Sequence, residues 1–274
     1  MIRLLNAGFT RLKKNKIFWL LTIFSIGLAL FMIYTQYSDM KKYGEVIEVY
    51  QLILNYSTII GVVIAIFTSL FLGVEYSDGA IRNKISIGHK RINIYISNLI
   101  MVTITSLFFY ILFMIVVAII GIPLFGEITI SVSTLLKLIG CIFVMIISYS
   151  SIFTFIAMMI SNKTITAIVS IMLVFGMMMA ALNCLNILSE QEFIQAGSFV
   201  DGEMKFEIVP NPKYPSESKK KVCQKIVDII PAGQAFQLVG RTAPDLKVLP
   251  LYSLGIFVIF TGAGMLLFKK KELK

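Results

Sequence analysis

Six long stretches of this chain contain no Asp, Glu, Lys or Arg, although the chain has 25 basic and 15 acidic residues. About 20 helical residues cross the ~30 Å hydrocarbon core of a bilayer. Lipid offers no partner for free backbone N–H and C=O groups, so such stretches must be helices. The sequence therefore predicts an all-α integral membrane protein with six transmembrane helices. The uncharged stretches are residues 17–37, 52–74, 93–126, 138–161, 164–189 and 248–268.

The basic residues gather on one side of the predicted bundle. Segments 1–16, 75–92, 162–163 and 269–274 hold 5, 4, 1 and 4 Lys/Arg, whereas the loops 38–51 and 127–137 hold two and one. This asymmetry predicts a multi-pass protein of the plasma membrane with both termini in the cytoplasm. The net charge of +10 then faces anionic lipid headgroups. No basic groove with interleaved aromatic residues indicates nucleic-acid binding.

The length fits one transmembrane domain over residues 1–274, without a separate soluble catalytic domain. Its first 16 residues place Ile2, Leu5, Phe9 and Leu12 at helical spacing among basic residues. This pattern predicts an amphipathic helix in the membrane interface, or else a simple positive anchor. The expected spans are about 17–37, 52–74, 96–122, 138–160, 165–188 and 250–268, with a cytoplasmic segment at 75–93 and an extracellular loop at 189–249.

The cytoplasmic segment after the second span contains a short helical pattern. Ile81, Lys84 and Ile85 share one face of that helix, and Gly79 and Gly88 bracket it as turn points. A short helix with a small apolar face can dock in a groove of a partner protein. It can equally lie on the lipid surface.

Six of the seven prolines lie between Pro210 and Pro250, in the extracellular loop and at the start of the last span. Residues 199–206 predict a weak β-hairpin with Asp201-Gly202 as its turn. Residues 216–230 predict a helix that Ser216 caps and Pro231 ends, followed by a short helix over 232–240. Val222, Ile226 and Ile229 are expected to line one side of the first of these helices. This loop is either a passive cap or a ligand-binding surface.

Several kinds of chemistry are absent from the sequence. No ionisable residue lies in the central part of a span, so neither a carrier with its own proton relay nor an intramembrane enzyme is expected. No GxxxxGK[ST] phosphate loop occurs, so the chain should bind no ATP or other cofactor itself. The single histidine and three cysteines have no metal-ligand spacing, and no metal is expected. Cys184 and Cys223 could form a disulfide.

The polar side chains within the spans are uncharged. Asn55 opens the second span and Asn183 closes the fifth, where Met177, Met178 and Met179 form part of a methionine-rich patch. Methionine suits loosely specified apolar ligands but also fills ordinary cores. These five residues are candidates for a translocation path, with close packing as the alternative.

One segment resembles a known family. Residues 71–84 read Phe-Leu-Gly-Val-Glu-Tyr-Ser-Asp-Gly-Ala-Ile-Arg-Asn-Lys, and Gly88-His89-Lys90-Arg91 follows. This segment resembles the Glu-x-x-x-Gly-[Thr/Ala]-[Ile/Leu]-Arg-Asn-Lys pattern of permease subunits of type-2 ATP-binding-cassette (ABC) exporters. The amphipathic start, the six spans and the basic ending agree with that family. The small size and the outer loop are most similar to the bacitracin-resistance and lantibiotic-immunity branch of Gram-positive bacteria.

The resemblance implies roles for particular residues. Segment 75–91 would be a coupling helix that contacts a separate ATPase subunit, which binds the ATP and Mg. Two permease copies, or this chain and a sister permease, would face two ATPase subunits. Helices around 216–240 would seal the exit. The implied coupling residues are Glu75, Gly79, Arg82 and Lys84, with Ile81 and Ile85 as apolar contacts, and the implied outer gate is Pro231, Gln234 and Phe236.

We therefore expect a membrane permease that exports a hydrophobic or amphipathic peptide or antimicrobial. The alternative is a non-transporting sensor or immunity scaffold that binds a ligand through its outer loop. The two differ in whether ligand binding needs an ATPase partner.

Overall fold

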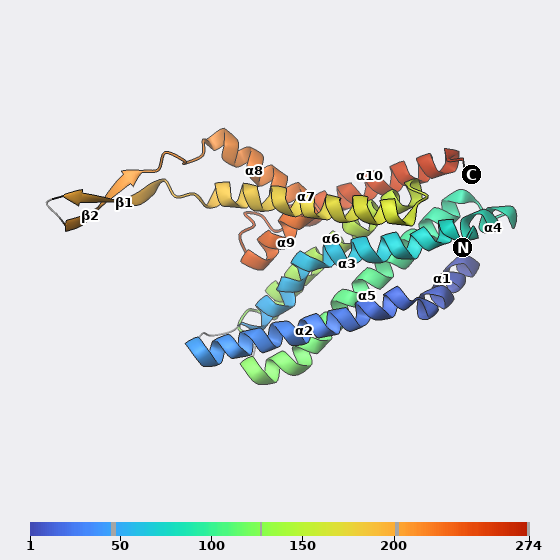
Figure 1. Cartoon of the computed structure of the whole chain (residues 1–274), viewed down its shortest axis with the longest axis horizontal. Helices are drawn as coiled ribbons and strands as arrows, with labels where there is room; N and C mark the ends of the chain where they lie inside the picture. Colours follow the sequence, from blue (N-terminus) through green and yellow to red (C-terminus); the bar gives the residue numbers. More distant parts are fainter. Residues whose placement is uncertain (45–47, 127, 201–202, 273–274) are drawn as a thin grey trace.

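The computed structural model describes the whole chain apart from residues 45–47, 127, 201–202 and 273–274. Both termini lie at one end of a helical bundle, together with α4, and we call this the terminus end (Figure 1). A hairpin and α8 lie at the opposite end, the loop end (Figure 1). In chain order the elements are α1 (Ile2–Lys14), α2 (Lys16–Tyr43), α3 (Val49–Ser77), α4 (Ala80–Ser86), α5 (Arg91–Phe125), α6 (Val132–Met159), α7 (Lys163–Ser189), β1 (Phe193–Val200), β2 (Glu203–Pro210), α8 (Glu217–Ile229), α9 (Pro231–Gly240) and α10 (Val248–Lys270).

The helical fold class is confirmed, because each of the six expected spans coincides with a long apolar helix: α2, α3, α5, α6, α7 and α10. Most of these helices extend past the predicted ends. The second helix continues through Asp39 and Lys41 to Tyr43 and ends at Gly44, whose φ of 69° favours glycine. With 35 residues, α5 is about 52 Å long, well beyond the ~30 Å hydrocarbon core. The helix α2 thus continues into a charged flank, whereas the length of α5 comes from its uncharged run.

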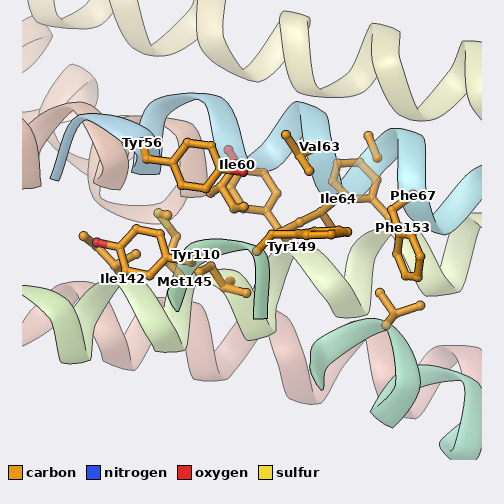
Figure 2. Close-up of a cluster of buried hydrophobic side chains, with 14 of the residues drawn as sticks. Tyr56, Ile60, Val63, Ile64, Phe67, Tyr110, Ile142, Met145, Tyr149 and Phe153 are labelled. Carbon is orange, nitrogen blue, oxygen red and sulfur yellow. The ribbon is translucent and has the colours of Figure 1, made fainter. Parts of the chain in front are cut away.

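The third helix forms the centre of the bundle and packs against α2, α5, α6 and α7. Figure 2 shows Tyr56, Ile60 and Phe67 of this helix meeting Tyr149 and other side chains of α5 and α6. Gly61 allows the close approach, because a Cβ there would lie 2.8 Å from Tyr149 Cζ and 3.0 Å from Val174 Cγ2. The end of this central helix carries the candidate site described below.

The first helix has two different apolar edges. Leu4 and Leu12 are buried where α1 packs on α5, whereas Ile2 is 75% exposed and Phe9 is 37% exposed. Asn15 ends this helix and caps the next, since its Oδ1 accepts a hydrogen bond from Phe18 N at 3.0 Å. The exposed apolar edge suits a membrane surface, and its contact with lipid stays a prediction.

The loop region is more structured than the sequence indicated. Strands β1 and β2 pair antiparallel from Phe193–Pro210 to Val200–Glu203, a hairpin longer than the predicted 199–206. The expected turn residues 201–202 lie outside the described residues. Ser216 Oγ caps α8 by accepting from Lys219 N, as predicted.

The prediction for the side of α8 is correct in part, since Ile226 is half-buried and packs on the cluster shared with α7, but Val222 and Ile229 do not. Val222 is 57% exposed and Ile229 is 42% exposed, whereas Cys223 and Val227 are buried. Cys223 and Val227 lie four positions apart and face Ala181 and Cys184 of α7. The sequence of α8 alone does not reveal that α7 packs on this side. The following helix, α9, packs against α3, α6, α7 and α8 and so closes the loop end of the bundle.

Candidate functional site

The candidate site begins where α3 ends and the chain turns back into α4. Gly79 stands between the two helices with a φ of 68°, a left-handed conformation in which a side chain is strained. Gly88 ends the turn after α4 with a φ of 95°. Both glycines thus form the turn points that the sequence predicted.

A buried carboxylate holds this turn against the bundle. Glu75 is 2% exposed and forms ion pairs with Arg11 of α1 and Lys84 of α4. Its Oε2 also accepts a hydrogen bond from Asn98 Nδ2 of α5 at 2.8 Å. A buried charge is strongly unfavourable unless it is paired and hydrogen-bonded, and here two cations and an amide supply that pairing. Glu75 therefore joins α1, α3, α4 and α5. We call Glu75, Arg11, Lys84 and Asn98 the Glu75 cluster.

The two cations of the Glu75 cluster are themselves partly desolvated. Burial lowers the pKa of Arg11 to about 10. Burial, and then the neighbouring Arg11 charge, lower the pKa of Lys84 to about 8. The guanidinium of Arg11 lies over the Phe71 ring, 3.8 Å from its centroid, which favours the cation. Each cation thus depends on the one carboxylate between them.

A second polar group ties the segment 268–271 to the same end. Arg91 Nη1 donates to the carbonyl oxygens of Phe268 and Lys271. Lys271 Nζ in turn donates to Tyr76 Oη at 3.1 Å and to Met158 O at 3.0 Å. This group, the C-terminal latch, joins the ends of α3, α5, α6 and α10. Burial lowers the pKa of Lys271 to about 8.

The residues predicted to contact an ATPase subunit divide into two sets. Glu75 and Ile81 are 2% and 1% exposed, so in this conformation they support α4 from inside and present no surface. Lys84 and Ile85 are half-buried on the same face, and Gly79 is half-buried in the turn. Of the predicted residues, Arg82 alone is exposed.

Sequence reasoning missed the apolar residue of the exposed face. Ile87 is 78% exposed directly after α4. It follows Asn83 by four positions, and Ser86 follows Arg82 by four, so the four residues form the helix face opposite Ile81 and Ile85. That spacing was available in the sequence, but it does not say which face the bundle covers. We call Arg82, Asn83, Ser86 and Ile87 the α4 surface.

The candidate path residues lie on two neighbouring helices. Gly61 faces Val174, and Ser69 Oγ donates to Thr166 O at 3.3 Å, so α3 and α7 run antiparallel. Continuing this register toward the loop end brings Asn55 to the depth of the segment 179–183. Asn55, Met177 and Met178 are half-buried, Met179 is 66% exposed and Asn183 is exposed.

The predicted gate residues hold the loop end together. Gln234 is 1% exposed; its Nε2 donates to Asp228 O and Leu249 O, and its Oε1 accepts from Ser253 Oγ at 2.6 Å. Pro231 is buried at the first position of α9. Phe236 lines a cavity of about 590 Å³ with Asn186, Gln224 and Gln237, among others.

Cys184 and Cys223 are neighbours in one small buried cluster, and each is a free thiol. The disulfide between them therefore stays a prediction. Among the described residues, no group of three His, Cys, Asp or Glu side chains could hold a metal ion.

Residues 4–180 match the family model described as ABC-2 family transporter protein. The match runs from α1 into α7 and includes the whole Glu75 cluster and the α4 surface. No curated protein matches the chain.

Proposed function

The chain belongs to the ABC-2 family of transporter proteins, and on this premise we propose that it is the membrane permease of an ATP-driven exporter. Permeases of this family are non-catalytic membrane subunits that work with a separate ABC ATPase. The substrate we propose is a hydrophobic or amphipathic peptide, such as an antimicrobial, that leaves the cell or the bilayer. The proposal includes the plasma membrane as location, cytoplasmic termini, and a role in antimicrobial resistance in Gram-positive bacteria.

The Glu75 cluster is the observation that carries this proposal. Lys84 fixes α4 to the carboxylate, and the carboxylate belongs to the last turn of α3. Through Arg11 and Asn98 the same carboxylate holds α1 and α5. A displacement of α4 by an ATPase subunit would therefore move three other helices with it. The third helix, about 43 Å long, would transmit that displacement to the loop end.

The α4 surface is the proposed contact with the ATPase subunit. It combines the apolar side chain of Ile87 with the cation of Arg82 and the amide of Asn83. An apolar groove with an acidic rim on the partner would complement these groups. ATP would bind the closed ATPase dimer more tightly than the open dimer. This difference in affinity would shift the conformational equilibrium of the whole complex.

The proposed path lies between α3 and α7 of two permease copies. The side chains of Asn183 and Asn186 are exposed on the loop-end half of α7. Hydrocarbon cannot satisfy an amide, so a second copy or a water-filled path is favoured over lipid on this face. Met179, exposed one turn away, adds an adaptable apolar contact for varied substrates.

Co-expression with its ATPase subunit tests the docking surface. We expect the variant Arg82→Glu with Ile87→Asp to lose ATPase co-purification and substrate-stimulated ATP hydrolysis. The matched control is Arg3→Glu with Ile208→Asp, which makes the same changes at exposed residues on α1 and β2. An intact, fully stimulated complex with the α4 variant would refute the proposal.

A second function is favoured by the loop-end cavity beside Phe236. Its volume of about 590 Å³ is in the range of small-ligand sites, and both amides and apolar groups line it. The chain would then be a sensor or immunity scaffold that binds a ligand at this end without transport. Peptide binding to the purified chain without any ATPase, together with the absence of transport by the complex, would favour this function.

A further inference from the structure

A groove at the loop end, between α6 and the start of α10, combines an apolar floor with two lysines. Its volume is about 620 Å³. Lys137, Gly140, Cys141 and Val144 form one wall, and their spacing of three and four residues is one face of α6. The opposite wall consists of Asp245, Leu246, Lys247 and Pro250. The Cys141 thiol donates to Leu246 O at 3.7 Å and joins the two walls.

Both lysines stand at the boundary between water and hydrocarbon. Lys137 directly precedes the uncharged run 138–161, and Lys247 directly precedes the run 248–268. Each run is long enough to cross the hydrocarbon core, so both ammonium groups belong at headgroup depth. Cys141 and Val144 continue the groove below them, along the apolar part of α6. A site for an amphiphile needs charged groups at its rim and an apolar groove at the depth of the hydrocarbon core, and this groove has both.

The balance of charge at the rim favours an anion. The acidic residue of the groove, Asp245, accepts a hydrogen bond at Oδ1 from the backbone N–H of Lys247 at 2.9 Å. Two cations therefore face one carboxylate that is already engaged with the backbone. A phosphate at this rim would lie near two ammonium groups, and a zwitterionic headgroup would gain less.

Gly140 keeps the groove open. A Cβ at this position would have no heavy atom within 4 Å. Its backbone conformation is ordinary for a helix, so a larger residue would fit there and fill the groove without strain. This gives a substitution that removes the space but not the fold.

We propose that this groove binds one glycerophospholipid with an anionic headgroup. Its phosphate lies between Lys137 and Lys247, and one acyl chain follows the Gly140–Val144 face of α6. The site lies away from the Glu75 cluster and the α4 surface, and it does not depend on the transport function proposed above.

The test uses the purified full-length chain in nanodiscs made from equal parts of phosphatidylglycerol and phosphatidylcholine. Native mass spectrometry after mild detergent transfer counts the lipid that is retained. We expect one retained phosphatidylglycerol. Lys137→Gln and Lys247→Gln should each weaken retention about fivefold, which corresponds to the contribution of about 1 kcal/mol that a lysine makes near an anionic lipid surface. Gly140→Leu should abolish retention.

Matched controls separate the groove from general effects. Lys225→Gln removes an exposed lysine of α8 outside the groove, and Gly27→Leu adds the same side chain at an open glycine of α2. Both should retain the lipid. Glycerol phosphate at millimolar concentration should not displace it, since a free headgroup lacks the acyl chain.

Three results would overturn the proposal. The first is equal retention of both lipids. The second is a Gly140→Leu protein that keeps its phosphatidylglycerol, because the lipid would then sit on surface charge alone. The third is displacement by glycerol phosphate, which would make the site one for a soluble phosphate.

Discussion

Replacing Glu75 by glutamine tests whether the buried carboxylate is the joint between α4 and the bundle. The change keeps the size of the side chain and removes its charge. Arg11 and Lys84 then face each other without an anion, and their side chains keep only 27% and 20% of their surface exposed. Breaking a fully buried ion pair costs about 3–5 kcal/mol. Because water still reaches both cations, we expect the lower end, about 3 kcal/mol.

Thermal unfolding of the purified chain in detergent measures this loss. At about 2–4 °C per kcal/mol for a chain of this size, Glu75→Gln should lower Tm by about 6–12 °C. The double variant Glu75→Gln with Lys84→Gln should be more stable than the single variant, because only one cation remains without a partner. Asp78→Asn, which removes an exposed charge three residues away, should change stability by less than about 0.5 kcal/mol.

The same variant separates docking from transmission. The α4 surface faces away from Glu75, so Glu75→Gln should still bind the ATPase subunit while losing stimulated ATP hydrolysis. An unchanged Tm, or a double variant as unstable as the sum of its two parts, would refute the view that the carboxylate neutralises both cations.

Three further changes address the site and the loop end. Gly79→Ala should cost about 1–2 kcal/mol because φ is 68°, although no atom blocks a Cβ; circular dichroism melting measures the loss, and no change would mean that the turn adapts. Acylation of Lys84 and Lys271, followed by mass spectrometry, should have its midpoint near pH 8, because burial lowers both pKa values and the neutral amine reacts; midpoints near 10.4 would contradict this. Mild oxidation should link Cys184 to Cys223, so that a chain cut by protease between them stays joined until it is reduced; separation before reduction would exclude the disulfide.

The transmembrane helices could be predicted because lipid restricts the sequence so strongly. An uncharged run of 20 or more residues has one stable solution in hydrocarbon, and all six runs are helices. Their ends could not be predicted, since α2 continues through Asp39 and Lys41 where water already satisfies the side chains. Outside the membrane the constraint is weaker, and there the hairpin β1–β2 proved longer than its turn signal indicated.

The site was predictable in position but not in its pairing. The turn glycines Gly79 and Gly88 follow from residue type alone, because few other residues adopt a positive φ. The partner of Glu75 could not be predicted from residue type, because Arg11 lies 64 residues earlier and several other basic residues were available. The same limit explains why Ile81 was predicted to contact a partner. Helical spacing places it on an apolar face but does not show that the bundle covers that face.

Two groups of polar contacts connect the helix ends at the terminus end. The Glu75 cluster joins α1, α3, α4 and α5, and the C-terminal latch joins α3, α5, α6 and α10. The two groups meet at Met158, whose Sδ lies 3.5 Å from Asn98 Nδ2 and whose carbonyl accepts from Lys271. Deeper in the spans the helices are held by packing and by hydroxyl contacts such as Ser25–Tyr56, which are individually weaker. A displacement of α4 would therefore be shared by the ends of α1, α3, α5, α6 and α10, because these two polar groups connect all of them.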